Sequence, residues 1–234
     1  MEKIIYLLWR DPAASATDFN RQLREQTAPA LKKIGAHSLT LNLPDADVAP
    51  AAGVRQVHLK PPPDAVVQVW VDSAIAHLRQ PFDDAIGAAC SRFAAYLVTE
   101  SQPLINRKHP PADGARTYGF AQIAILRKPA KLTHEAWLDI WHNSHTKVAV
   151  ETQSTFEYVQ NVIVRALTAD APAIDAIVEE GFPPAAMTDY KVFFDAPGDE
   201  AKFKKNLQRM MESVHRFIEP GSIDVIPTSQ YRFS

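Results

Sequence analysis

Two segments of this chain carry large side chains at the same spacing, and they are 118 positions apart. The corresponding positions (137 − 19, 141 − 23 and 145 − 27) are Phe19 and Trp137, Leu23 and Trp141, and Thr27 and His145. Steps of four residues place side chains on one face of an α-helix. The repeat therefore predicts a duplicated chain with one equivalent helix in each half.

The hydrophobic pattern predicts the same order of elements in both halves: strand, helix, strand, strand, helix, strand. This is the order of the ferredoxin-like split unit, which leaves one face of its sheet needing cover. We therefore predict an α+β fold in which two ferredoxin-like repeats form an α+β barrel within one chain, with helices outside and side chains or a pocket between the sheets. The expected strands are 3–9, 36–43, 64–72, 93–101, 118–126, 156–168, 174–182 and 223–231, and the expected helices are 19–33, 73–89, 133–149 and 199–218.

Proline-rich segments mark the boundaries of this organisation. We place the first repeat at 1–102, a linker at 103–116 and the second repeat at 117–234. The segment 44–63 is rich in Pro, Ala and Asp, which is typical of an irregular excursion. Pro29 is expected to kink the last turns of the first helix.

Composition excludes several classes of partner. The chain has 234 residues, 46% of them hydrophobic and 22% charged, with a formal net charge of −2, which is typical of a globular protein in water. Its basic residues form no long runs, so we expect no nucleic-acid partner. No stretch is long and apolar enough to span a bilayer, and the amino terminus lacks the hydrophobic segment of a signal peptide. We expect no membrane association and a cytoplasmic location.

The residues that hold metals and phosphates in other proteins are scarce here. Cys90 is the only cysteine, which excludes an internal disulfide and a thiolate-clustered metal site. The eight glycines form no phosphate-binding loop, so nucleotide chemistry is not expected. His134, His142 and His145 lie close in sequence, but no inward carboxylate completes a ligand set. We therefore expect no metal and no cofactor.

The predicted helix at 133–149 holds the most useful chemistry. Thr133 suits its N-cap, and Trp137, Trp141 and His145 share its apolar stripe. A buried imidazole needs a partner or a ligand, so His145 is either a core residue bonded to a backbone carbonyl or an acid/base group. Burial would lower the pKa of His145 and the helix C-terminus would raise it, and the sequence leaves that balance open.

Several strand residues interrupt the apolar pattern. Gln68, Gln122 and Asn161 either line a cavity or form hydrogen bonds at strand ends and edges. Tyr158 and Asn161 are candidates to donate hydrogen bonds to a developing oxyanion, and ordinary strand packing is the alternative. Trp141 is either a packing residue or a platform for a ligand.

These residues resemble the EthD-like family of the dimeric α+β barrel superfamily. The second half carries the pattern throughout and the first half carries it in part, without the helix Trp and His. The matching residues are Arg127, Trp137, Trp141, His145, Tyr158-Val159-Gln160-Asn161 and Asp175-Ala176-Ile177-Val178-Glu179 in the second half, and Arg10, Phe19, Leu23, Pro29 and Asp64-Ala-Val-Val-Gln-Val-Trp in the first.

The resemblance implies a cofactor-free pocket for a small aromatic or polyketide-like molecule, in a family whose members act as dehydratases, decarboxylases or aromatases and commonly pair as homodimers. Under this hypothesis His145 is the acid/base group, and Trp141, Tyr158, Asn161 and Gln122 contact the substrate. The alternative is a binding or accessory protein for oxygenase-dependent degradation, without chemistry of its own. A third possibility, haem held by His145, predicts a Soret band in the purified protein.

Overall fold

The computed structural model describes all 234 residues, and each half follows the predicted order of elements. None of its helices has the length and apolar composition needed to cross a membrane. The first half contains β1 (Glu2–Trp9), α1 (Ala16–Gln22), the π-helical turn η1 (Leu23–Thr27), α2 (Ala28–Lys33), β2 (Ser38–Leu43), the 3-10 segment η2 (Ala46–Val54), β3 (Ala65–Val71), α3 (Ala76–Gly87) and β4 (Arg92–Leu104). The second half contains β5 (Phe120–Leu126), α4 (His134–Asp139), the π-helical turn η3 (Ile140–His145), α5 (Thr146–Thr152), β6 (Glu157–Ala166), β7 (Ala176–Phe182), the 3-10 segment η4 (Pro184–Met187), α6 (Tyr190–Phe193), α7 (Glu200–Val214) and β8 (Asp224–Phe233).

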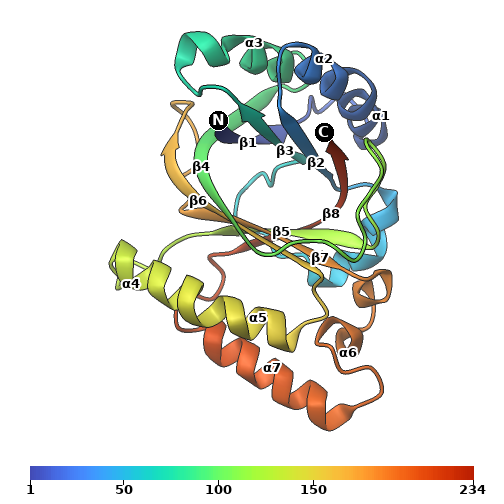
Figure 1. The fold of residues 1–234 in the computed structure, drawn as a ribbon, viewed down its shortest axis with the longest axis vertical. Helices are drawn as coiled ribbons and strands as arrows, with labels where there is room; N and C mark the ends of the chain where they lie inside the picture. The colour runs from blue at the N-terminus through green and yellow to red at the C-terminus, as the bar shows by residue number, and fades with distance from the viewer.

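The eight strands close into one barrel in the order β1-β3-β2-β8-β5-β7-β6-β4, and all neighbours are antiparallel. The halves join where β2 pairs with β8 and where β4 pairs with β6. Helices α1–α3 cover one side of the barrel and α4–α7 cover the opposite side (Figure 1). The predicted α+β barrel within a single chain is therefore confirmed.

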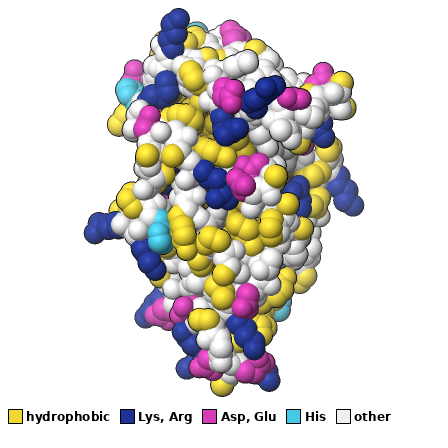
Figure 2. All heavy atoms as spheres, turned by 90° about the vertical axis from the view of Figure 1, so that its right-hand side faces the viewer, with side chains coloured by type: hydrophobic (Ala, Val, Ile, Leu, Met, Phe, Trp, Pro, Cys, Tyr) yellow, Lys and Arg dark blue, Asp and Glu magenta, His cyan; other side chains and the backbone are white.

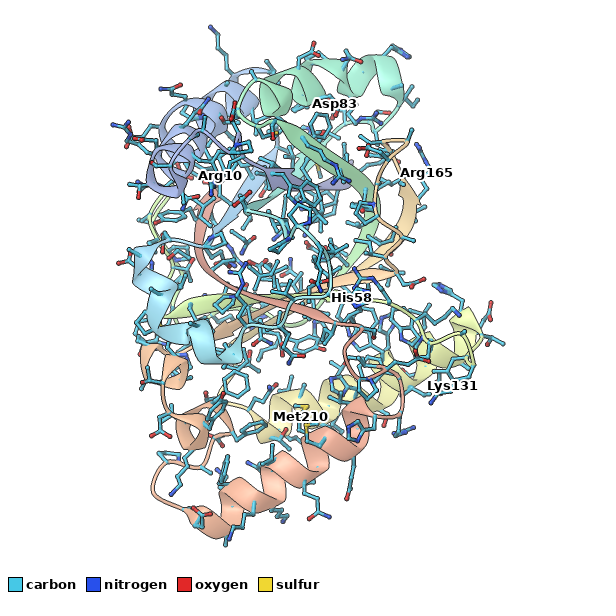
Figure 3. The ribbon with its side chains drawn as sticks, turned by 180° about the vertical axis from the view of Figure 1, so that it is seen from behind. Arg10, His58, Asp83, Lys131, Arg165 and Met210 are labelled. Carbon is cyan, nitrogen blue, oxygen red and sulfur yellow. The ribbon has the colours of Figure 1, made fainter.

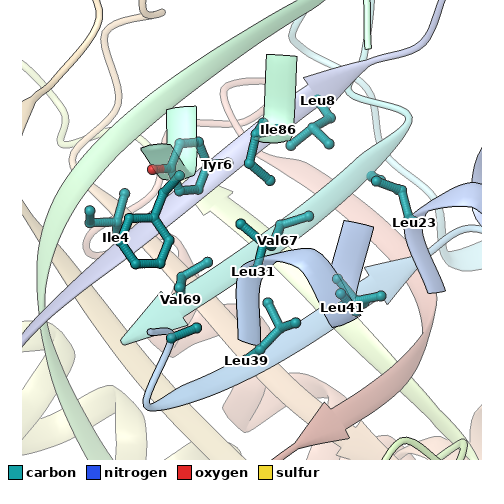
Figure 4. Close-up of a cluster of buried hydrophobic side chains, with 14 of the residues drawn as sticks. Ile4, Tyr6, Leu8, Leu23, Leu31, Leu39, Leu41, Val67, Val69 and Ile86 are labelled. Carbon is teal, nitrogen blue, oxygen red and sulfur yellow. The ribbon is translucent and has the colours of Figure 1, made fainter. Parts of the chain in front are cut away.

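Barrel closure explains why the strands are apolar on both faces. Alternate residues of β1 point in opposite directions, so Ile4 and Tyr6 pack against the helices while Ile5 and Leu7 face the barrel interior. The first-half core between sheet and helices is continuous and closely packed (Figure 4). On the face shown in Figure 2, acidic and basic side chains are interspersed, so no field of one sign dominates it.

Of the two alternatives predicted for the space between the sheets, side chains or a pocket, the structure has side chains, which fill the barrel interior (Figure 3). Ile5, Leu7 and other apolar residues occupy part of it, and a buried polar network occupies another part. In that network Glu179 accepts hydrogen bonds from Gln68 Nε2 at 2.9 Å and from Gln230 Nε2 at 2.7 Å. Gln68 is therefore a structural residue inside the barrel, and the prediction that it lines a cavity is wrong.

The first helix of each half contains a π-helical turn at the same place. The turn ends at Thr27 in the first half and at His145 in the second. Thr133 caps the second of these helices as predicted, because its Oγ1 accepts from the Ala136 N–H at 3.2 Å. Pro29 lies in the first turn of α2, where a proline is tolerated, and the π-helical turn rather than a proline kink precedes it.

The loops differ most from the prediction. Strand β4 extends to Leu104, so the segment 103–116 begins inside a strand. The excursion at 44–63 contains the 3-10 segment η2. The segments η4 and α6, which were not predicted, follow β7, and α6 brings Phe193 under the second sheet. Short elements such as these have too few residues for a periodic pattern.

Gly119 provides a test of the close packing at the start of β5. Its φ is +73°, and a Cβ there would lie 1.9 Å from the Phe182 carbonyl oxygen, whereas at Gly198, with φ +75°, a Cβ would meet nothing within 4 Å. Gly198→Ala is expected to cost only backbone strain, about 1 kcal/mol. Gly119→Ala is expected to cost on the order of 3 kcal/mol or more, because backbone must move. Urea unfolding of both variants measures the difference, and equal losses would contradict this packing.

Candidate functional site

The main cavity lies outside the barrel, between the second-half sheet and its helices. It has a volume of about 470 Å³ and is lined by 26 residues, of which 16 are hydrophobic. This volume is within the range of small-molecule sites. The sheet side is formed by β5, β6, β7 and β8, and the helix side by η3, α6 and α7. Met210 lies on α7, which packs against α5 (Figure 3).

Three polar side chains form a row across the sheet side of this cavity. In the strand register Glu180 of β7 pairs with Tyr158 of β6 on one side and with Gln122 of β5 on the other. All three line the cavity. We call Tyr158, Glu180 and Gln122 the polar row. Because adjacent strands are about 5 Å apart, the row is a compact group of donors and acceptors under one ligand-sized space.

Glu180 is the most unusual member of the polar row. Its side chain is buried, with 7% of the residue exposed, and the only hydrogen bond it receives from the protein is from Gln122 Nε2 at 3.1 Å. Burial raises the pKa of Glu180 to about 7, although the bond from Gln122 opposes the shift. No cation pairs with this carboxyl group, and no Lys or Arg lines the cavity.

His145 faces the cavity from the last residue of η3. It is 7% exposed, its Nδ1 lies 3.0 Å from Ser213 Oγ on α7, and its ring is 4.5 Å from the ring of Phe217. Burial lowers the pKa of His145 to about 4, with a further contribution from Arg216. The helix continues to Thr152, so His145 does not lie at its C-terminus. Nε2 has no protein partner and is not sealed from solvent, which leaves it free to meet a ligand.

The two tryptophans of the helix have different roles. Trp137 is fully buried and donates from Nε1 to the Phe217 carbonyl at 3.0 Å, which fixes the segment after α7. Trp141 lines the cavity and donates from Nε1 to the Tyr158 hydroxyl at 3.2 Å. Burial, reinforced by Glu180, raises the pKa of Tyr158, so its phenol stays neutral. The phenol therefore keeps its own proton for a further acceptor.

The structure brings together four of the five residues predicted for the site: His145, Trp141, Tyr158 and Gln122. Asn161 is the exception, because it faces the barrel interior, where its Oδ1 accepts from Lys3 Nζ at 2.8 Å and its Nδ2 donates to the Ile177 carbonyl. Its placement in a substrate pocket is therefore wrong. Sequence reasoning missed Glu180 and named its neighbour Glu179, which points into the barrel.

The donor set offers little for a metal or a haem. No group of three or more His, Cys, Asp or Glu side chains is placed to hold a metal ion. A haem bound through His145 would bring two propionates into a lining that has no Lys or Arg. Two desolvated carboxylates without a counter-cation are costly, so this lining does not fit that group.

No protein-family model and no curated protein sequence matches the chain. Among solved structures, an anthrone oxidase-like protein superposes with a TM-score of 0.58 at 9% sequence identity, over 100% of this chain and 91% of that one. A chlorite dismutase from Candidatus Nitrospira defluvii gives a TM-score of 0.44 at 12% identity, over 98% of this chain and 90% of that one. The first likeness shows that this chain shares the overall fold of that protein, and in this chain the fold is a closed eight-stranded barrel covered by helices. At these identities the likeness concerns the fold alone.

The lowered pKa of His145 predicts how stability depends on pH. The folded value of about 4 lies below the roughly 6.5 of an unfolded histidine, so the unfolded chain binds the extra proton between these values. Stability is therefore lost as pH falls from about 6.5 toward 4, by roughly 3 kcal/mol relative to His145→Gln. Urea unfolding at both pH values measures this difference. His134→Gln changes an exposed histidine of the same helix and is the control. Its free energy of unfolding should fall between the two pH values by as much as that of the unchanged protein.

Proposed function

We propose that this protein carries out cofactor-free acid/base chemistry on a small aromatic or polyketide-like molecule, as a dehydratase, decarboxylase or aromatase, with His145 as the acid/base group. The substrate occupies the cavity between the second-half sheet and its helices, against Trp141, Tyr158 and Gln122. The proposal is supported by a free ring nitrogen and a polar row that face one largely apolar cavity.

The observation that carries the proposal is the contrast between the two halves. In the first half, Val69 of β3 pairs with Leu39 of β2 and with Ile4 of β1, in the same three-strand arrangement as the polar row. These three side chains are buried in a continuous core, together with Leu23 at the position that matches Trp141 (Figure 4). The fold is thus stable with apolar residues at these sites, and a buried carboxyl group at Glu180 is better explained by function than by packing.

The neutral state of His145 suits it to take a proton near pH 7. A substrate C–H bond next to a carbonyl group breaks, the proton moves to Nε2, and the electron pair moves toward the carbonyl oxygen. Return of the proton at another carbon completes an isomerisation, and loss of a neighbouring hydroxyl group as water completes a dehydration. The Ser213 hydroxyl either donates to Nδ1 or accepts from it, so it serves both tautomers of the ring.

The low pKa of His145 favours a second candidate function. A base with a pKa of about 4 is weak, and efficient general bases have pKa values near the working pH. The alternative is therefore a binding or accessory protein that holds the same class of molecule for an oxygenase-dependent pathway. In that case His145 contributes only a hydrogen bond to the ligand.

We also infer that the two halves are EthD-like repeats, with units at 1–102 and 117–234 around the segment 103–116. The shared element order, the matched π-helical turns and the two strand rows support this inference. Within one chain the repeats supply both halves of a barrel that two subunits would otherwise build. Further pairing of two chains into a homodimer stays a prediction, and light scattering measures it.

Hydrogen–deuterium exchange tests the chemistry without knowledge of the natural substrate. The probe is 2-tetralone, an enolisable bicyclic ketone, in D2O, and proton NMR follows loss of the hydrogens next to its carbonyl. The protein is expected to accelerate exchange over buffer, and His145→Gln is expected to reduce the protein-dependent rate about 100-fold or more. His215→Gln, at the exposed mouth of the cavity, is the matched control and should exchange as the unchanged protein does.

Two results would contradict acid/base catalysis by His145. One is a His145→Gln variant that exchanges 2-tetralone at the rate of the unchanged protein. The other is an absence of protein-dependent exchange although 2-tetralone raises the melting temperature, which would favour the binding function.

A further inference from the structure

Glu180 is the only carboxyl group on the sheet side of the cavity, and the proton-transfer scheme above does not use it. It lies at the centre of the polar row, between Tyr158 and Gln122. The preceding residue, Glu179, points to the opposite face and accepts hydrogen bonds from three amide groups inside the barrel. Neighbouring carboxyl groups on one strand thus have opposite environments, one rich in donors and one with a single donor.

The surroundings of Glu180 do not suit an ionised carboxylate. A carboxylate has about four acceptor sites, and the protein supplies one donor, from Gln122. An unpaired buried charge is costly, and the group neutralises instead. A neutral carboxylic acid needs fewer partners and gains an O–H donor. The one hydrogen bond that the Glu180 side chain makes is the bond from Gln122, so the O–H of the neutral acid is available to a ligand in the cavity.

We propose that Glu180 is a neutral carboxylic acid that donates a hydrogen bond to the carbonyl oxygen of an uncharged, planar ligand, so that the cavity selects neutral carbonyl compounds over carboxylates. This inference rests on the proposed function, because the same cavity is the binding site, and it favours the dehydratase and aromatase activities over the decarboxylase, whose substrate carries a carboxylate. An anionic ligand would be desolvated without a counter-cation, since no Lys or Arg lines the cavity. Aromatic walls, including Phe193, Phe217 and Trp141, suit a planar ring system.

The titrating groups around Glu180 agree with this assignment. The pKa of Glu180 is raised to about 7 by burial, and that of His145, across the cavity, is lowered to about 4 by burial. The usual order of a carboxyl group and an imidazole is thus reversed, so at pH 6 the carboxyl group holds the proton and the imidazole is free to take one. Tyr158 stays neutral beside Glu180. The remaining titratable residues of the lining, at the mouth, are Tyr190, His215 and Glu219.

The arrangement gives the two groups complementary roles. When His145 takes a proton from the carbon next to the ligand carbonyl, negative charge develops on the carbonyl oxygen. A hydrogen bond from the Glu180 O–H to that oxygen stabilises the charge, as an oxyanion donor does. No oxidant or reductant is needed, because one C–H bond breaks and one N–H bond forms. Glu180 is therefore assigned as a catalytic residue that contacts the substrate oxygen.

Binding of naphthalene derivatives as a function of pH tests the proposal. The probes are 2-acetonaphthone, a neutral ketone, and 2-naphthoate, a carboxylate of similar size, measured by calorimetry. The ketone is expected to bind at pH 6 and to weaken about tenfold by pH 8, as Glu180 ionises with a pKa of about 7. Glu180→Gln keeps an N–H donor of similar shape, so its affinity is expected to be independent of pH and within about threefold of the value at pH 6. 2-Naphthoate is expected to bind at least tenfold more weakly than the ketone at either pH.

Matched variants separate this inference from the proposed function. Glu219→Gln and His215→Gln, at the exposed mouth, should keep the pH dependence. His145→Gln should bind the ketone with the same pH dependence even though it loses hydrogen exchange. A pH dependence that persists in Glu180→Gln, equal affinity for 2-naphthoate, or no binding of the ketone at pH 6 would each overturn the proposal.

Infrared spectroscopy provides a test on the unchanged protein, which does not depend on whether a variant folds. The C=O stretch of a protonated carboxylic acid should be present in the unchanged protein at pH 6 and disappear by pH 8.5. Its absence at pH 6 would overturn the neutral state of Glu180.

Discussion

Closure of the eight-stranded barrel is the constraint on which the rest of the structure depends. Because every strand has a hydrogen-bonded neighbour on both sides, no edge is exposed, and each strand has one face inside the barrel and one beneath helices. Polar side chains are tolerated on these faces only where partners exist. Inside the barrel Glu179 has such partners, and they come from β2, β3 and β8. That network links strands of both halves and leaves the barrel interior closed to a ligand.

The two halves solve the same packing problem differently. In the first half Ile4, Val69 and Leu39 fill the space between sheet and helices, and the result is a sealed core. In the second half the corresponding layer has Gln122, Glu180 and Tyr158 on the sheet and an open volume above them. One half therefore acts as an internal reference for what the fold itself requires. In the second half, the buried side chains of the polar row all line one cavity.

The sequence predicts the architecture better than the site, for a physical reason. Periodicity reports which residues share a face, so it predicts the barrel, the cap at Thr133 and the inward direction of His145. A cavity forms where the side chains do not fill the space between two elements. The periodic pattern does not show whether this happens inside the barrel or between the sheet and the helices. The position of Glu180 was available from strand alternation, because it shares a face with Val178 and Phe182 and opposes Glu179. That parity argument also removes Asn161, which faces the barrel interior opposite Tyr158.

The π-helical turn at His145 has a counterpart in the first half, so the comparison of the halves shows which features belong to the fold and which are specific to the cavity. Such turns are frequent at functional sites, and η3 ends at His145, the buried imidazole of the cavity lining. The same turn is present in the first half, where it ends at Thr27 beside a sealed core. The turn is therefore a property of the fold, and it sets the direction of the side chain at its last residue. The function we propose depends on two further differences: an imidazole at that position, and a carboxyl group on the neighbouring sheet with too few partners to remain charged.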